Sequence, residues 1–318
     1  MKLINKRHLF NPQSHNFLGL VGYNFAQSPQ AIVLEDRVRV YFSSRVSDQE
    51  GMFISVIRFI DYSLDFEQVI SYSTDEVITN GELGTFDEHG IFPFSPTVID
   101  GKIFAYTCGW SRRVSVSVET STGLVVSEDG GKTFKRMGKG PILSSSLYEP
   151  CLVGDSFVRK YNDTFHMWYM YGKYWKGATE NEPPARVYKI GHATSTDGIN
   201  WSKEEGIQIL EDVLNKDECQ ALPTVIEKNG LYRMFFCYRY ADDFRTNKER
   251  GYRLGYAESS NLQDWVRKDE EINFETTDDW DNSMRCYPNL VEVNDKVFLL
   301  YNGNEFGKKG FGVVEVVF

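Results

Sequence analysis

A short turn sequence that recurs along the chain constrains the fold more than any other feature. The clearest copy is -SEDGGKTF- (127–134), and looser copies are -STDGINW- (195–201) and -SSNLQDW- (259–265). Asp and Ser side chains bond to nearby backbone in such turns, Gly supplies a positive φ, and the closing aromatic residue packs under the turn. The motif therefore predicts a structural hairpin turn rather than a catalytic site. Its spacing is close to one blade of a β-propeller.

A second repeat stands ahead of these turns. It is a proline followed by a short apolar run, a turn and a second run rich in aromatic residues, and its copies span 28–42, 95–107, 149–172, 222–238 and 287–303. Asp100-Gly101 and Asn229-Gly230 are strong signals for tight hairpins between the two runs. Five copies predict five blades, and proline is tolerated where an inner strand begins.

The repeats predict an all-β fold, a five-bladed β-propeller with four-stranded antiparallel blades around a central channel. We expect residues 1–318 to form a single domain. Helical periodicity is hard to find, and Tyr, Phe and Val are plentiful. Only three strands are visible in the last blade, so Lys2–Phe10 is expected to supply the fourth and remove an open edge. The alternative is a frayed N-terminus.

Composition excludes several classes of partner and location. The formal charge of −10 argues against nucleic acid or an anionic membrane as the main partner. No apolar run is long enough to span a bilayer, and the first residues lack the apolar stretch of a signal peptide. The five cysteines show no CxxC pattern, which favours reduced thiols in a cytoplasmic protein. The oligomeric state stays open.

Candidate functional residues lie just before and at the start of each inner strand, because these positions gather at the mouth of a propeller channel. Blade by blade they are Asn24, Gln27 and Ser28; Asp87, Glu88, His89 and Ser95; Tyr148 and Glu149; Asp217, Glu218 and Gln220; and Asp281, Arg285 and Tyr287. Carboxylates that share one cavity push their pKa values apart, so that one can act as an acid while another stays ionised. Two carboxylates that flank a bond are what glycoside cleavage needs.

Aromatic residues follow the second strands, where loops reach the channel mouth: Trp110, Tyr174, Trp175 and Tyr240. Such platforms suit the faces of sugar rings, although aromatic residues at strand ends also commonly just pack. No set of His, Cys and carboxylate residues has metal spacing, so no metal or other cofactor is predicted.

This pattern resembles the five-bladed propeller glycosidases, a group that includes arabinanases, β-xylosidases, invertases, levansucrases and the related mannoside phosphorylases. The likeness rests on five blades, acidic residues and prolines at the inner strands, and -DGxxW- turns, and it covers nearly the whole chain as a pattern. It implies a carbohydrate-active enzyme that cleaves or transfers a glycosidic bond. It also implies a catalytic Asp in blade one, a supporting Asp in a middle blade and a general-acid Glu in the next. Members of the group sometimes hold a calcium ion in the channel.

On this chain, Glu149 in -YEPCL- matches the supporting carboxylate and Glu218 in -DECQALP- resembles the general acid. Asp87, Glu88 or Asp281 would complete the catalytic set. The predicted substrate contacts are Arg285, His89, Tyr287, Asn24, Gln27, Trp110, Trp175, Tyr240 and Arg239. The blade-one segment -GYNFAQSPQAIV- departs from the pattern, since it carries no acid.

Three alternatives follow from the missing acid and the turn motif. In a phosphorylase, phosphate replaces water and is held by cations such as Arg285, Arg239, Arg245 and His89, with Arg112-Arg113 nearby. A second alternative is a glycan-binding or scaffold propeller without catalytic activity. A third is a sialidase-like enzyme, because -SEDGGKTF- fits the sialidase Asp box, but such enzymes usually have six blades. A small oligosaccharide or an activated sugar is the expected substrate.

Overall fold

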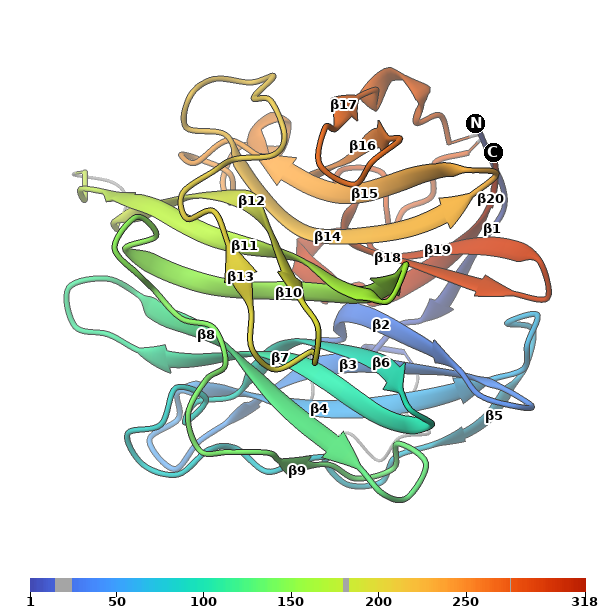
Figure 1. Ribbon diagram of the computed structural model, residues 1–318, viewed down its shortest axis with the longest axis horizontal. Coiled ribbons are helices and arrows are strands. Elements are labelled where there is room, and N and C mark those ends of the chain that lie inside the picture. Colours follow the sequence, from blue (N-terminus) through green and yellow to red (C-terminus); the bar gives the residue numbers. More distant parts are fainter. Residues whose placement is uncertain (15–24, 180–182, 275) are drawn as a thin grey trace.

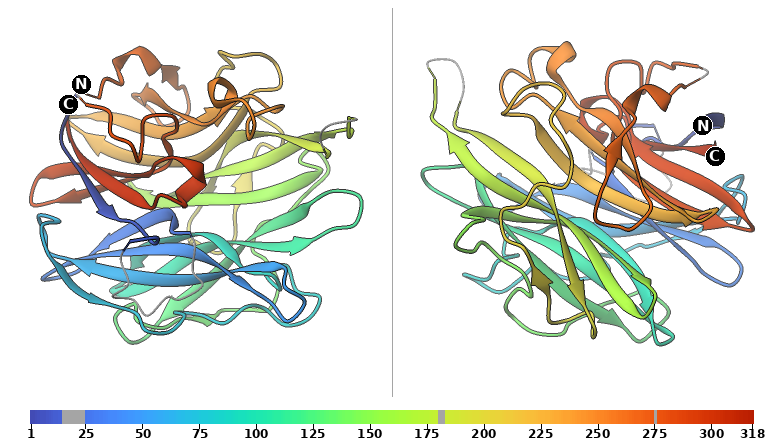
Figure 2. Two further views of the ribbon diagram at one scale, coloured as in Figure 1. Left: turned by 180° about the vertical axis from the view of Figure 1, so that it is seen from behind. Right: turned by 45° about the horizontal axis from the view of Figure 1, so that its top comes forward.

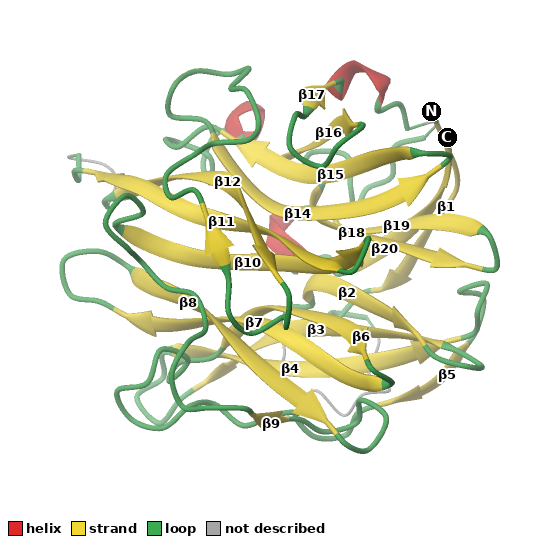
Figure 3. Cartoon of the chain, in the orientation of Figure 1, coloured by secondary structure: helices red, strands yellow, loops and turns green. Residues whose placement is uncertain are grey.

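The computed structural model describes residues 1–14, 25–179, 183–274 and 276–318, and Figure 1 shows its strands gathered into five blades. Each blade is a four-stranded antiparallel sheet, which confirms the predicted five-bladed β-propeller. The helical elements within the described ranges are three short 3-10 turns, η2 (Lys248–Arg250), η3 (Asp269–Glu271) and η4 (Glu305–Gly307) (Figure 3). None of the described helices is long and apolar enough to cross a membrane.

The blades follow one another along the chain, each running from its inner to its outer strand. The first comprises β2 (Gln27–Val33), β3 (Val38–Ser47), β4 (Phe53–Tyr62) and β5 (Val69–Tyr72). The second comprises β6 (Ile91–Ile99), β7 (Lys102–Arg112), β8 (Val118–Ser127) and β9 (Lys135–Arg136). The third comprises β10 (Cys151–Tyr161), β11 (Thr164–Lys176), β12 (Ala185–Ser195) and β13 (Ser202–Lys203). The fourth comprises β14 (Cys219–Lys228), β15 (Leu231–Arg239), β16 (Arg253–Ser259) and β17 (Val266–Arg267).

The fifth blade combines both ends of the chain. It comprises β18 (Cys286–Val293), β19 (Lys296–Asn302), β20 (Phe311–Val317) and, as its outer strand, β1 (Lys2–Phe10). β1 pairs antiparallel with β20, so the two termini lie side by side (Figure 2). The buried Phe10 ring lies 5.5 Å from Phe42 of the first blade and 5.6 Å from Phe311 of the last. Aromatic contacts therefore join the first and last blades where the propeller closes.

The second strand of each blade carries an almost continuous apolar run because neighbouring blades cover both of its faces. In β11, Met167, Trp168 and Tyr169 are all fully buried. An alternating pattern would be expected only if one face met water. The aromatic second runs of the sequence repeat are therefore the packing layers between blades.

The -SEDGGKTF- turn lies between β8 and β9 and has the structural role predicted for it. Ser127 Oγ accepts the backbone N–H of Gly131 at 2.8 Å, and the Asp129 carboxylate accepts those of two following residues. The Tyr41 hydroxyl of the preceding blade donates to the Gly131 carbonyl at 2.6 Å. In the same way, Tyr106 donates to the carbonyl of Gly198 in the -STDGINW- turn. These two turns thus fasten the second blade to the first and the third blade to the second.

The inner strand of every blade contains a β-bulge. The register shifts between Gln27 and Gln30, Ile91 and Phe94, Gly154 and Phe157, Ala221 and Thr224, and Cys286 and Asn289. The first bulged residue is Ser28, Phe92, Asp155, Leu222 or Tyr287, and all of these except Phe92 have a φ near +50°. A β-bulge bends its strand and changes the direction in which the side chains of that strand point.

The observed bulges show that two of the predicted repeats were placed in the wrong register. In the second blade Pro93, rather than Pro96, lies in the bulge. In the third blade the bulge that corresponds to the other inner strands contains Asp155-Ser156, and Glu149-Pro150 precedes the strand. The proline of the sequence repeat was misleading there, because Ser156 takes its place in the bulge.

Candidate functional site at the mouth of the channel

A pocket of about 620 Å³ lies at one end of the channel, where three inner strands begin. Gln27 of β2, Phe92 of β6 and Tyr287 of β18 line it, and Trp110 contributes from the end of β7. The Phe92 and Tyr287 rings meet edge to face at 5.2 Å. The pocket therefore has the size of a small-molecule site and aromatic walls suited to a sugar ring.

Four arginines also line the pocket. Arg45 ends β3, Arg186 begins β12, Arg239 ends β15 and Arg245 follows in the next loop. Within the described part of the chain, none of the four forms an ion pair with a carboxylate. Guanidinium groups converge here although the chain as a whole carries a formal charge of −10. Such a cluster favours an anionic ligand.

Arg239 is the most buried of these arginines, with 1% of its surface exposed. Its guanidinium lies 3.6 Å from the Phe244 ring centre and 5.2 Å from the rings of Tyr188 and Tyr252, whose hydroxyls are hydrogen-bonded to each other. One terminal nitrogen donates to the Tyr240 carbonyl at 2.6 Å. The Nε atom is buried and has no hydrogen-bond partner among the described residues. A buried N–H without a partner is costly, so the position of Arg239 is maintained by the surrounding rings and backbone carbonyls at some cost in stability.

Asp155 occupies in β10 the bulge position that Tyr287 and Phe92 occupy in their own strands. The charge of Arg186, the Cys108 thiol and the backbone of Leu222 each lower the pKa of its carboxyl. Burial raises the pKa of Asp155 to about 7 in spite of that positive charge. Asp155 is not itself a lining residue of the pocket, but it is a carboxyl that holds a proton near neutral pH and interacts electrostatically with Arg186, which lines the pocket.

The structure brings several predicted residues together. Gln27, Trp110, Arg239 and Tyr287 all line the pocket, as does the predicted phosphate contact Arg245. Asn24 lies outside the described residues. Sequence reasoning missed Arg45, Arg186, Phe92 and Asp155. Arg45 lies near the end of the second strand of its blade and Arg186 near the start of a third strand, and neither was among the predicted residues; Phe92 and Asp155 were hidden by the misplaced prolines.

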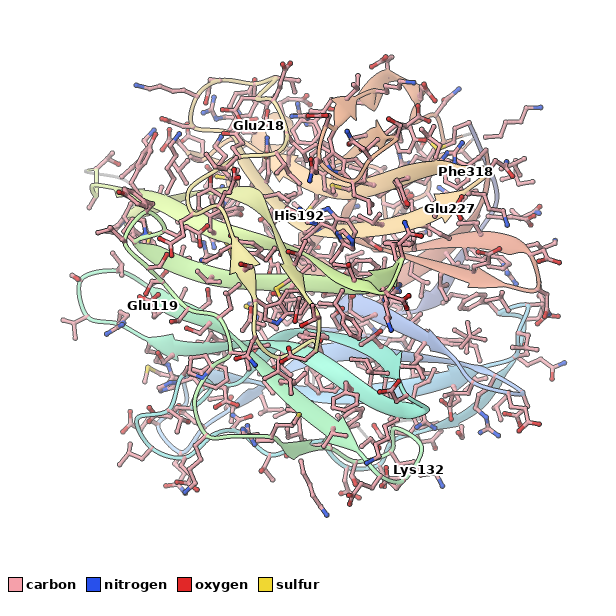
Figure 4. The ribbon with its side chains drawn as sticks, in the orientation of Figure 1. Glu119, Lys132, His192, Glu218, Glu227 and Phe318 are labelled. Carbon is pink, nitrogen blue, oxygen red and sulfur yellow. The ribbon has the colours of Figure 1, made fainter. Side chains whose placement is uncertain are left out.

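Four predicted catalytic carboxylates do not line this pocket. Asp87, Glu149, Glu218 and Asp281 are almost completely buried, and each pairs with a cation on the outer strand of its own blade, namely Arg136, Lys203, Arg267 and Lys6. Figure 4 labels Glu218 beside the loop that leads into β14. Glu218 accepts the backbone N–H groups of Val213 and Leu214 as well as the guanidinium of Arg267. The oxygens of Glu218 are thus occupied by hydrogen bonds within its own blade.

The remaining predicted residues also lie outside the pocket lining. Glu88 accepts the backbone N–H of Gly84, and His89 stacks behind Trp110 with 5.6 Å between ring centres. Arg285 pairs with Asp281 and lies over the Phe274 ring. Trp175 packs against the buried cluster of Cys151 and Cys219, and Tyr240 lies 4.2 Å from the Arg250 guanidinium. His89 contacts the pocket wall through Trp110, and the Tyr240 carbonyl contacts it through Arg239.

No protein-family model matches the chain. The uncharacterized protein MT1551 of Mycobacterium tuberculosis (strain CDC 1551 / Oshkosh) is 29% identical over 281 residues, which cover 87% of each chain. The 1,2-beta-oligomannan phosphorylase of Thermoanaerobacter sp. (strain X514) is 27% identical over 146 residues, or 42% of this chain and 44% of that protein.

Solved structures of low sequence identity share the fold. A thermostable family-43 glycoside hydrolase has a TM-score of 0.66 and 14% identity, and the match covers 92% of this chain and 90% of that one. The α-L-arabinanase of Penicillium chrysogenum, solved as a complex with arabinobiose, has a TM-score of 0.58 and 12% identity, with 100% and 98% covered. The chain thus has the five-bladed propeller fold that glycoside hydrolases use.

Proposed function

We propose that this protein is a carbohydrate-active enzyme that breaks a glycosidic bond in the channel-mouth pocket, with phosphate as the attacking group. The observation that carries the proposal is the convergence of four arginines, free of carboxylate partners among the described residues, on a pocket with aromatic walls. Guanidinium groups bind phosphate through paired N–H donors, and aromatic faces bind sugar rings. The name of the partly matching relative, an oligomannan phosphorylase, adds support.

The residues at the inner-strand bulges favour phosphate over water as the group that attacks the glycosidic bond. Cleavage by a pair of carboxylates requires two of them across the bond. Of the five bulge positions only Asp155 is a carboxylic acid, and the first blade has Ser28 there. Phosphate brings its own negatively charged oxygen, so one carboxyl group is enough.

Asp155 is proposed as the proton donor, in the role that the resemblance assigned to Glu218. A phosphate oxygen bonds to the anomeric carbon as the glycosidic C–O bond breaks, and the leaving oxygen takes the proton of Asp155. The products are a sugar 1-phosphate and an alcohol. The proton that hydrogen phosphate loses restores Asp155 through solvent. The pKa of about 7 keeps part of the protein in the protonated form at neutral pH.

The test is to incubate the purified protein with aryl glycosides and short oligosaccharides, with and without phosphate, and to measure sugar 1-phosphate by ³¹P NMR. We expect product only with phosphate, none from Asp155→Asn, and phosphate binding weakened about tenfold or more in Arg186→Gln. Lys132→Gln, an exposed substitution in the -SEDGGKTF- turn (Figure 4), is the control and should behave like the unsubstituted protein. Sugar released in phosphate-free buffer would refute phosphorolysis.

A second candidate is a propeller that binds glycans without cleaving them. It is favoured by the serine at the first-blade bulge, where an acid would be needed for hydrolysis. In that case saccharides would raise the melting temperature of the protein while no sugar is released under either condition.

We also propose that the protein works in the cytoplasm. All five cysteines are buried, and none forms a disulfide. Burial raises the pKa of Cys151 to about 11, so that thiol stays protonated and inert, as expected in a reducing compartment. Fractionation of the producing cells would test this location, and recovery outside the cytoplasm would contradict it.

A further inference from the structure

The arginines of the pocket stand on two sides of the channel. Arg186 belongs to the third blade and Arg239 and Arg245 to the fourth, whereas Arg45 belongs to the first. In a ring of five blades the first lies opposite the boundary between the third and the fourth, as the positions of β3, β12 and β15 in Figure 1 show. The two groups of cations therefore face each other across the channel mouth.

Aromatic side chains fill the wall between the two groups. Phe92 and Trp110 come from the second blade and Tyr287 from the fifth. Tyr287 interacts electrostatically with both Arg45 and Arg245, so cations of both groups act on this wall. A sugar ring that rests on this wall has a cation at each end.

Arg45 is held in position before any ligand arrives. Its guanidinium lies 4.3 Å from the Phe25 ring centre and 4.6 Å from that of Phe53. Its Nε donates to Gln27 Oε1 at 3.0 Å, and Gln27 in turn donates to the Phe306 carbonyl at 2.6 Å. The two terminal nitrogens make no hydrogen bond to any described residue. A fixed guanidinium fork with free terminal N–H groups matches a carboxylate or a phosphate.

The charge of the pocket exceeds what one phosphate can neutralise. Its described lining contains the four arginines and Lys308, against the single carboxylate of Glu305, which pairs with Lys308 at 3.1 Å. A phosphate carries at most two negative charges, so cations on the far side would remain without a counter-charge. An uncompensated, partly buried guanidinium is unfavourable.

We infer that the pocket has two anion subsites and that the sugar substrate carries its own acidic group, bound by Arg45 opposite the subsite for the attacking phosphate. The acidic group is a carboxylate, as in a uronic acid, or a phosphate ester on the sugar, since both present paired oxygens to the guanidinium. This inference rests on the proposed function for the identity of the first anion. The second subsite stands on the geometry of Arg45 alone.

The test compares sugar 1-phosphates with and without a second acidic group by calorimetric titration. The probes are glucose 1-phosphate, glucose 1,6-bisphosphate and glucuronic acid 1-phosphate, together with their mannose and galactose counterparts. We expect at least one of the doubly acidic probes to bind about tenfold or more tightly than its singly acidic counterpart. Tighter binding of the uronic acid identifies a carboxylate substrate, and tighter binding of the bisphosphate identifies a phosphate ester.

Arg45→Gln should abolish this preference, because it should weaken the doubly acidic probes more than glucose 1-phosphate, and Lys132→Gln should preserve the preference. Equal binding of singly and doubly acidic probes, or an equal loss for both in Arg45→Gln, would overturn the inference. If no sugar 1-phosphate binds, that result refutes the proposed function and not the Arg45 subsite. Glucuronate and glucose 6-phosphate then decide the Arg45 subsite, because at least one of them must bind the unsubstituted protein more tightly than the Arg45→Gln variant.

Discussion

Glu218 Oε1 lies 2.6 Å from a terminal guanidinium nitrogen of Arg267, across the full width of the fourth blade. Glu218 stands just before the inner strand of that blade and Arg267 on its outer strand. Three other blades repeat this arrangement with Asp87, Glu149 and Asp281 as the acid. The ion pair therefore ties the start of an inner strand to the edge of the same blade, and four carboxylates serve the fold in this way.

Glu218→Gln should lower stability and leave chemistry intact. The substitution removes one of the two carboxylates that pair with the buried Arg267, the other being Asp269, and this costs about 1 to 3 kcal/mol in the free energy of unfolding. Urea denaturation measures this loss, while turnover per folded molecule should not change. Glu128→Gln is the control, because Glu128 pairs with Lys135 on the surface and its loss costs about 0.5 kcal/mol or less. A variant with normal stability and no turnover would instead restore Glu218 as the acid.

Asp155 should make stability fall as pH rises. Its carboxyl has a pKa of about 7 in the folded protein, raised above an unfolded value of about 4, so the folded state binds more protons between these values. Unfolding free energy should decrease by about 3 kcal/mol between pH 4 and pH 7 through this group. Asp155→Asn should remove that slope and be relatively more stable at pH 8 than at pH 4. Parallel stability curves for the two proteins would show that Asp155 does not titrate there.

Asp129 should have the opposite effect on stability, which should fall as pH is lowered. Hydrogen bonds from the turn backbone and from Thr133 and Ser127 outweigh desolvation and lower the pKa of its carboxyl to about 2. The stabilisation is complete above the unfolded value of about 4 and is lost as pH falls toward 2. Because the side chain is exposed, screening limits the effect of Asp129→Ala to about 1 kcal/mol at pH 7. Thermal unfolding at pH 7 and at pH 2 should show this difference only at the higher pH.

Phe10→Ala should weaken the packing between the first and last blades, where the propeller closes. The ring of Phe10 is completely buried between Phe42 and Phe311, and a cavity of that size costs about 3 to 5 kcal/mol. Val317→Ala, on the partly exposed end of β20, should cost less than about 1 kcal/mol. Chemical denaturation of the two variants measures both values. Equal costs would mean that Phe10 does not hold the first and last blades together.

Part of the candidate site could be predicted because it depends on strand ends. Gln27, Trp110, Arg239 and Tyr287 lie where strands begin or end, and those positions were readable from the repeats. Asp155 was missed because Glu149-Pro150 imitates the opening of an inner strand. The bulge at Asp155-Ser156 has no proline, and a bulge becomes visible only in the pairing of two strands.

The sequence by itself determined the strands, the turns and the number of blades. These features depend on residues close together in the chain, such as Ser127 and Asp129, whose side chains bond to the backbone of their own turn. The tertiary structure alone decided which carboxylates face the channel. Asp281 pairs with Lys6, 275 residues away, and Glu218 with Arg267, 49 residues away. A charged side chain turns toward whichever partner the fold brings near it, because a buried charge is stable only when it is paired.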